Sequence, residues 1–275
     1  MEKTKELQPL QYRKFDTAST YDPLLLQQMK VDTINNQQGE LKDYDCAACK
    51  NRGFIAKLRG LDPVMVECDC MGIRRCIRKM EASGLKHVIR EMTFDSYQAE
   101  QPWQETVKQG AMAYAADPQG WFLLSGQSGA GKTHLCTAIC RKLLYDGRKV
   151  RYMSWREEVG RLKSLALEHD ARQSLLEELK KAEVLYIDDL FKGGTEQEGA
   201  KPTAADGSLA FEILNYREHN RLPTILSTEK TEAELLQIDT AIGSRILHRS
   251  GAHTYIIGKD PKKNYRLRNM PKNIR

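Results

Sequence analysis

The residues best suited to chemistry form a glycine-rich segment near the middle of the chain. Gly126-Gln-Ser-Gly-Ala-Gly-Lys-Thr133 fits the pattern G-x-x-x-x-G-K-S/T. The short apolar run 121–124 before it predicts a buried strand, and helix-forming residues follow from His134 onward. Backbone N–H groups and a helix N-terminus would then converge on one point, which is how proteins bind phosphate. The segment therefore predicts a nucleotide phosphate site.

Two residues of this loop have expected chemical roles. Lys132 is expected to reach the β- and γ-phosphates of ATP, and the Thr133 hydroxyl to ligate Mg²⁺. A glycine-rich turn that binds nothing is the alternative, and the flanking strand and helix argue against it. The other expected nucleotide contacts are Gly126, Ser128, Gly129, Ala130, Gly131 and His134.

A second feature is a strand that ends in two acids, Val184-Leu-Tyr-Ile-Asp188-Asp189, which has the form of a Walker B segment. Asp188 is expected to hold Mg²⁺ directly or through water, and Asp189 to orient or deprotonate the attacking water. The alternative is a strand that merely ends in an acidic turn. Together the two features predict an ATPase with ATP and Mg²⁺ as cofactors.

Five of the seven cysteines lie in one short segment ahead of the phosphate loop. Cys46-x-x-Cys49 and Cys68-x-Cys70 supply two close pairs of thiolates, the ligand set of a tetrahedral structural Zn²⁺. Four thiolates leave no position for a substrate water, so zinc would stabilise a small domain rather than take part in chemistry. Cys76 could replace Cys68 or Cys70, and the spacing alone also permits an iron–sulfur cluster.

The length of 275 residues leaves room for about two domains. We expect a small helical domain over residues 1–85, a linker over 86–95 and an ATPase domain over 96–275, with Cys136 and Cys140 in its core. Strand-like runs alternate with helical segments in the ATPase part, which predicts an α/β fold with a parallel sheet flanked by helices. These runs span residues 121–124, 149–153, 184–187 and 224–227.

Composition limits the class of protein. No apolar run approaches the roughly 18 residues of a membrane helix, and the N-terminus lacks an apolar signal sequence. A cytoplasmic protein without a membrane partner is expected. The net charge is +6, and residues 259–275 hold seven Lys or Arg against the single acid Asp260. Such a segment suits a polyanionic partner, or simply solubility.

Taken together, these motifs resemble the AAA+ helicase loaders of the DnaC and DnaI type, especially the versions carried by phages and prophages, and the related IstB transposition ATPases. The resemblance covers nearly the whole chain. It implies an N-terminal domain that binds the hexameric, DnaB-type replicative helicase and an AAA+ domain that binds ATP and single-stranded DNA. Besides the three motifs above, it rests on the segments 83–85, 94–97, 187–192, 211–217, 223–229 and 243–246.

The resemblance also carries roles for two charged residues. Arg245 matches the arginine finger, which would reach the nucleotide of a neighbouring subunit and so implies self-association through nucleotide sites. Glu229 lies in the sensor 1 region, where the family often has Asn. A carboxylate there would repel the γ-phosphate unless Mg²⁺ or a basic residue intervenes. Glu229 could position the lytic water or face another subunit, and slow hydrolysis is expected.

Single-stranded DNA is expected along residues 154–181, where the resemblance implies an inserted helix pair. Basic side chains there would contact phosphates, and a solvated helix face is the alternative. Tyr152 and Trp155 could stack on bases or lie in the core. The basic residues are Arg156, Arg161, Lys163 and Arg172.

The leading hypothesis is an ATP-dependent helicase loader in DNA replication. An IstB-like transposition helper is the nearest alternative, although the cysteine-rich segment is not expected in one. A P-loop kinase would use Arg245 within one chain. A single-stranded DNA-binding protein that ATP switches without useful turnover is the third alternative.

Overall fold

The structure is a computed structural model that describes residues 22–81, 88–193 and 202–268. The chain forms two compact units. The first contains the chain up to Leu41 together with Asp45–Cys68, and the second contains Lys42–Tyr44 and the chain from Asp69 onward. The expected functional boundary near residue 85 stays a prediction.

Helix α1 (Pro23–Asn36) opens the described part of the first unit. The Asp22 carboxylate accepts a hydrogen bond from a backbone N–H of the first turn at 2.9 Å, which caps the helix. Near its other end, Asn35 donates to the Ala56 carbonyl and accepts from the Ala56 N–H, both at 2.9 Å. One amide side chain thereby ties the helix to the neighbouring strand.

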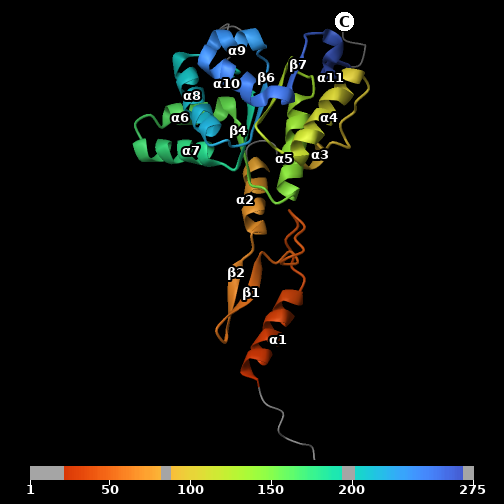
Figure 1. The fold of residues 1–275 in the computed structure, drawn as a ribbon, viewed down its shortest axis with the longest axis vertical. Coiled ribbons are helices and arrows are strands. Elements are labelled where there is room, and N and C mark those ends of the chain that lie inside the picture. Colours follow the sequence, from red (N-terminus) through yellow and green to blue (C-terminus); the bar gives the residue numbers. More distant parts are fainter. Residues whose placement is uncertain (1–21, 82–87, 194–201, 269–275) are drawn as a thin grey trace, which may run out of the picture. The chain divides into compact units, whose positions relative to one another are not determined.

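A β-hairpin completes this unit (Figure 1). Strands β1 (Phe54–Arg59) and β2 (Asp62–Glu67) pair antiparallel and turn at Gly60, which has a φ of +67°. The sequence analysis expected only helix here and missed the hairpin. Ala56 is its only buried residue, so the hairpin has little hydrophobic periodicity to detect.

The second unit is built on a five-stranded parallel sheet of order β4-β5-β6-β3-β7 (Figure 1). The four predicted strands are confirmed, and the short edge strand β7 was missed. All six residues of the interior strand β3 are buried, as expected where helices cover both faces of a parallel sheet. The strands are β3 (Trp121–Gly126), β4 (Val150–Ser154), β5 (Val184–Leu190), β6 (Thr224–Thr228) and β7 (Thr254–Ile257).

Helices pack on the sheet through two apolar clusters of buried residues. One includes Cys136 and Cys140 of α5, both fully buried, so their predicted place in the core is confirmed. Tyr152 and Trp155 are also buried, so their core alternative is correct and base stacking is excluded for these rings. The helices are α2 (Cys70–Met80), α3 (Val88–Glu91), α4 (Pro102–Ala116), α5 (Lys132–Tyr145), α6 (Trp155–Ser164), α7 (His169–Lys181), α8 (Ala204–His219), α9 (Glu232–Ile238), α10 (Thr240–Ser250) and α11 (Tyr265–Arg268).

Arg217 of α8 is fully buried and connects this helix to the sheet through hydrogen bonds. Its guanidinium donates to the carbonyls of Ala182 at 2.8 Å and Pro223 at 2.6 Å and to the Thr224 hydroxyl at 2.9 Å. These contacts join α8 to the segments that lead into β5 and β6, because one planar group with five N–H donors can serve several carbonyls at once.

The topology decides where chemistry is possible. Because β3, β5 and β6 are parallel neighbours, their carboxyl ends meet at one edge of the sheet. The phosphate loop follows β3, the two acids lie near the carboxyl end of β5, and Glu229 follows β6. Within the described residues, no helix has both the length and the apolar character needed to cross a membrane. A cytoplasmic location stays a prediction.

Candidate nucleotide-binding site

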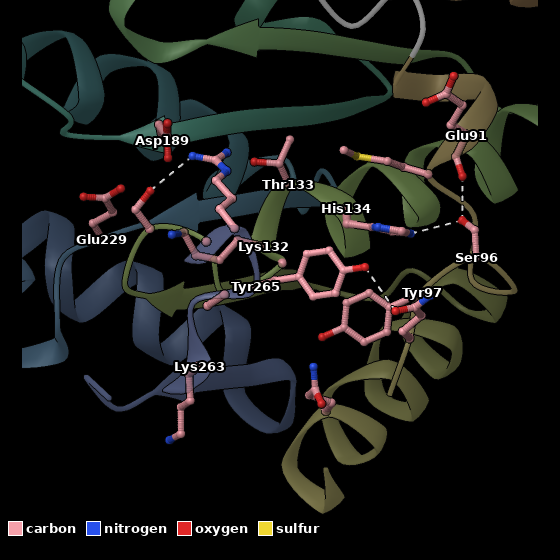
Figure 2. A pocket seen from close by; sticks show the side chains of 18 of the residues that line it. Glu91, Ser96, Tyr97, Lys132, Thr133, His134, Asp189, Glu229, Lys263 and Tyr265 are labelled. Carbon is pink, nitrogen blue, oxygen red and sulfur yellow. Dashed lines mark hydrogen bonds between the residues drawn. The ribbon is translucent and has the colours of Figure 1, made fainter. Parts of the chain in front are cut away.

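The predicted phosphate loop joins β3 to α5 and lines a cavity of about 390 Å³ (Figure 2). Small-molecule sites usually range over roughly 300–1,000 Å³, so the cavity can hold a nucleotide. Gly131 precedes α5 at a φ of +85°, and Gly129 has a φ of +78°. A Cβ atom on Gly129 would lie 2.0 Å from Asn264 Oδ1, so the loop needs glycine there for space as well as for conformation.

Lys132 is folded back onto its own loop. Its ammonium donates to the carbonyls of Gly126 at 2.7 Å and Gln127 at 3.0 Å. Burial lowers the pKa of Lys132, while the carboxylates of Glu229 and Asp189 act in the opposite direction. A phosphate anion would favour the charged ammonium more strongly than carbonyl oxygens do.

Hydroxyl groups surround the carboxylate of Asp188. Its Oδ1 accepts from Ser227 Oγ at 2.5 Å, Tyr186 Oη at 2.6 Å and Thr133 Oγ1 at 3.4 Å. Its Oδ2 accepts from Tyr152 Oη at 3.3 Å. Burial, together with the nearby Asp188 carboxylate, raises the pKa of both tyrosines, which keeps them neutral donors. The Thr133 hydroxyl and the Asp188 carboxylate are hard oxygen ligands side by side, and this donor set fits Mg²⁺.

Lys192 lies between two carboxylates at the cavity wall. Its ammonium is 2.8 Å from Asp189 Oδ2 and 3.3 Å from Glu229 Oε1. Although burial acts to lower it, these carboxylates raise the pKa of Lys192. The positive charge of Lys192 therefore offsets the negative charge of Glu229, so that an anionic ligand is less strongly repelled. The sequence analysis gave it no role, although its place three residues after Asp189 in a turn was a usable signal.

The C-terminal segment forms a wall that the sequence analysis did not foresee. The Tyr265 N–H donates to the Gly129 carbonyl at 2.9 Å, and Arg266 Nη1 donates to Ser128 Oγ at 3.5 Å. The Gln127 side chain exchanges two hydrogen bonds with the Asp260 backbone, at 2.7 and 2.8 Å. Part of the basic segment 259–275 therefore turns toward the phosphate loop, and its last seven residues lie outside the described ones.

Another part of the wall comes from the chain ahead of α4, where the Tyr265 hydroxyl donates to Gln98 Oε1 at 3.1 Å. Tyr97 lines the cavity and meets the ring of His134 edge-on, with ring centroids 5.2 Å apart (Figure 2). His134 Nε2 lies 2.9 Å from the Thr93 carbonyl and 3.3 Å from Ser96 Oγ. His134 thus lines the cavity and also secures this wall, and its contact with nucleotide stays a prediction.

Arg245 is not among the described residues that line this cavity. Its Nε pairs with Glu218 Oε2 at 2.8 Å, and its guanidinium lies 5.0 Å from the centroid of the Phe211 ring. A quarter of the side chain remains exposed. Arg245 is thereby held at the surface formed by α8 and α10, and its role as a finger stays a prediction.

The predicted zinc ligands come together. The sulfur atoms of Cys46, Cys49, Cys68 and Cys70 all lie within 4.8 Å of one another, and Cys46 and Cys68 are 3.8 Å apart. A tetrahedron with Zn–S bonds of about 2.3 Å has edges of about 3.8 Å. The Gly53 N–H donates to Cys49 Sγ at 3.3 Å, which is the kind of outer contact that orients a metal ligand. The four thiols fit zinc, and Cys76 does not belong to the group.

Comparisons with known proteins agree with this geometry. Residues 55–273 match the family of IstB-like ATP binding proteins. The phage-like element PBSX protein XkdC of Bacillus subtilis (strain 168) is 32% identical over 244 residues, which cover 84% of this chain and 89% of that protein. The replicative helicase loader DnaC of Escherichia coli (strain K12) is 24% identical over 176 residues, 62% of this chain and 68% of that protein. These matches confirm the resemblance to phage-borne and DnaC-type proteins.

Among solved structures, one titled as a DNA replication initiation factor has a TM-score of 0.50 at 16% identity, over 65% of this chain and 53% of that chain. A likeness at this identity concerns the fold alone. With the strand order of the sheet and the family match, it confirms the expected AAA+ fold.

We expect purified protein to hold about one Zn²⁺ per chain, because the four buried thiolates supply the complete tetrahedral ligand set of one ion. Replacing Cys46 by Ser should release the metal and lower the melting temperature, because metal binding contributes to folding free energy. Metal analysis and thermal unfolding measure both. Cys76→Ser is the matched control and should keep the zinc. A wild-type protein with far less zinc, and an unaffected Cys46→Ser variant, would refute the site.

Replacing Arg266 by Ala should weaken ATP binding about tenfold, because a charge-assisted hydrogen bond is worth about 1.5–3 kcal/mol. Calorimetric titration with ATP measures the change. Lys259→Ala removes the same charge from the same segment at an exposed position that does not line the cavity, and it should bind ATP like the wild type. Equal affinities of the two variants would exclude a special role for Arg266.

Proposed function

Because this chain belongs to the family of IstB-like ATP-binding proteins, we propose that it is an ATP-dependent helicase loader in DNA replication, which brings a hexameric DnaB-type helicase to single-stranded DNA. The observation that carries the proposal is that Lys132 and Thr133 line one nucleotide-sized cavity while the carboxylate of Asp188 lies against the Thr133 hydroxyl, in a chain whose relatives include a named replicative helicase loader.

In the proposed ATPase, each residue near the cavity has a separate task. Lys132 binds the β- and γ-phosphates, and Thr133 and Asp188 hold Mg²⁺, which when bound neutralises phosphate charge. Asp189 orients the attacking water. Its carboxylate is paired with Lys192 at 2.8 Å, as is Glu229 at 3.3 Å. Slow hydrolysis follows, because a carboxylate engaged by an ammonium is a weaker base.

Arg245 is proposed to complete the site of a neighbouring subunit. A role within its own chain has no support, since Arg245 does not line the cavity described above. The ion pair with Glu218 and the contact with Phe211 hold the guanidinium at the surface of the unit. A finger that acts between subunits requires assembly, and this requirement gives a direct test.

We expect Lys132→Ala and Arg245→Ala proteins each to lack stimulated ATPase activity. Lys132→Ala keeps an intact finger, whereas Arg245→Ala keeps an intact nucleotide site. A mixture of the two should therefore recover part of the wild-type rate, because mixed assemblies contain some complete sites. Steady-state phosphate release measures this recovery. A mixture as inactive as its components, under conditions where the two proteins co-assemble, would rule out action between subunits.

The first compact unit is the proposed helicase-binding part. Leu25 and Met29 of α1 are 59% and 57% exposed, and Met65 of β2 is 51% exposed. Exposed apolar side chains that gather on a small unit are typical of protein-binding surfaces. The proposed DNA contacts lie instead on α6, where Arg156 and Arg161 are exposed. Lys163 of the same helix is already paired with Asp206 at 2.8 Å, so it is a weaker candidate.

Mixed with the replicative helicase of its host, the protein should form a discrete complex. The double change Leu25→Glu and Met29→Glu should abolish this complex, because charges on the apolar face oppose its burial. Size-exclusion chromatography with light scattering, with and without ATP, measures the complex. Met112→Glu, at a similarly apolar position of α4 that is 41% exposed, is the control. Absence of any complex with wild-type protein would favour a transposition helper, which the IstB-like family match also allows.

A further inference from the structure

The carboxylate of Asp188 is almost completely withdrawn from water, with 8% of the residue exposed. Among the described residues, no basic side chain forms a salt bridge with it. A buried charge needs compensation, either from a cation or from hydrogen bonds. Here the compensation comes from hydroxyl groups, three of which belong to residues without an assigned role in metal binding: Tyr152, Tyr186 and Ser227. We call these three residues the hydroxyl cradle.

The two oxygen atoms of Asp188 are treated differently by the cradle. Oδ1 accepts short hydrogen bonds from Tyr186 at 2.6 Å and Ser227 at 2.5 Å, whereas Oδ2 accepts only a long one from Tyr152 at 3.3 Å. The contact from Thr133 Oγ1 is also long, at 3.4 Å. The short bonds fix the carboxylate in place, and the long bond from Thr133 is the one that a metal ion could replace most easily.

The cradle is built on three adjacent strands of the sheet. Tyr152 lies on β4, Tyr186 on β5 and Ser227 on β6. All three side chains are buried, and the rings of Tyr152 and Tyr186 meet edge-on with centroids 5.3 Å apart. Tight packing on a rigid sheet leaves the hydroxyl groups little freedom, which is the property of supporting residues that hold a metal ligand in place.

Ser227 connects the metal ligand to the residue that follows it. Its hydroxyl donates to Asp188 Oδ1 and also accepts from the Asp189 N–H at 2.9 Å. Asp189 has a φ of +54°, a conformation that L-residues adopt rarely and that surrounding contacts must hold. One hydroxyl therefore holds both the carboxylate and the turn that presents Asp189.

We propose that Tyr152 and Tyr186 are positioning residues for Mg²⁺: with Ser227 they fix the carboxylate of Asp188 and so set the affinity of the site for the metal ion. This inference rests on the proposed function, since it concerns the same ATP site. None of these three residues lines the cavity, so their effect would pass through Asp188. They should therefore change the metal dependence of nucleotide binding and leave metal-free binding unchanged.

The test is the binding of a fluorescent ATP analogue to the full-length protein during a titration with Mg²⁺, and separately in EDTA. Tyr186→Phe should raise the half-saturating Mg²⁺ concentration about tenfold, because loss of an outer contact of a metal ligand typically weakens metal binding about 10–100-fold. Tyr152→Phe should raise it less, about threefold, because its hydrogen bond is longer. Affinity in EDTA should match the wild type, because Lys132 and the loop are unchanged.

Tyr114→Phe is the matched control. Tyr114 is fully buried in the same apolar cluster, and its hydroxyl donates to the Gly120 carbonyl at 3.1 Å rather than to Asp188. The control variant should keep the wild-type dependence on Mg²⁺ even where its melting temperature falls. A loss of metal affinity equal to that of Tyr186→Phe would overturn the proposal, because it would reflect a general effect of removing a buried hydroxyl.

A folded Tyr186→Phe protein with wild-type half-saturation would also overturn the role of the cradle, while leaving the ATP site intact. If Tyr186→Phe does not fold, the Tyr152→Phe protein provides the test. An unchanged half-saturating Mg²⁺ concentration in that protein overturns the proposal. A wild-type protein that binds the analogue without any dependence on Mg²⁺ gives a different result. It overturns the proposed ATPase site itself, and the cradle with it.

Discussion

The structure depends on a buried carboxylate that must stay close to a phosphate loop. Asp188 lies near the carboxyl end of β5 and beside Thr133, the last residue of the loop motif. A carboxylate in this position is costly unless several donors satisfy it. The sheet supplies them from three strands, with Tyr152, Tyr186 and Ser227. The parallel arrangement of β4, β5 and β6 is therefore what holds the carboxylate of Asp188, the proposed metal ligand, in one position.

Charges around the cavity are arranged in opposing pairs. Lys192 separates Asp189 from Glu229, so two carboxylates can lie near an anionic ligand without leaving a large excess of negative charge. Arg266 adds a positive charge from the C-terminal segment, which reaches the loop because β7 pairs with β3. This balance of charge is consistent with the slow hydrolysis proposed above.

The two compact units differ in how much apolar surface they bury. The larger unit buries apolar side chains on both faces of its sheet. In the smaller unit the hairpin buries only Ala56, and α1 leaves several leucines exposed. Such a unit is too small to be held by a hydrophobic core alone, and it contributes Cys46, Cys49 and Cys68 to the cysteine group that fits a structural metal.

Local signals in the sequence determined much of this protein. The spacing of Gly126 to Thr133, the acids Asp188 and Asp189 and the paired cysteines each follow from short-range patterns, and four of the five parallel strands show as apolar runs. Tertiary structure decided the rest. Ser227 meets Asp188, Lys192 meets Glu229 and Arg266 meets Ser128 only because the order of the strands and the return of the C-terminal segment bring distant parts of the chain together. The hairpin and β7 were missed because short strands with little burial leave no periodicity to detect. Contacts between distant segments depend on packing, which no local pattern encodes.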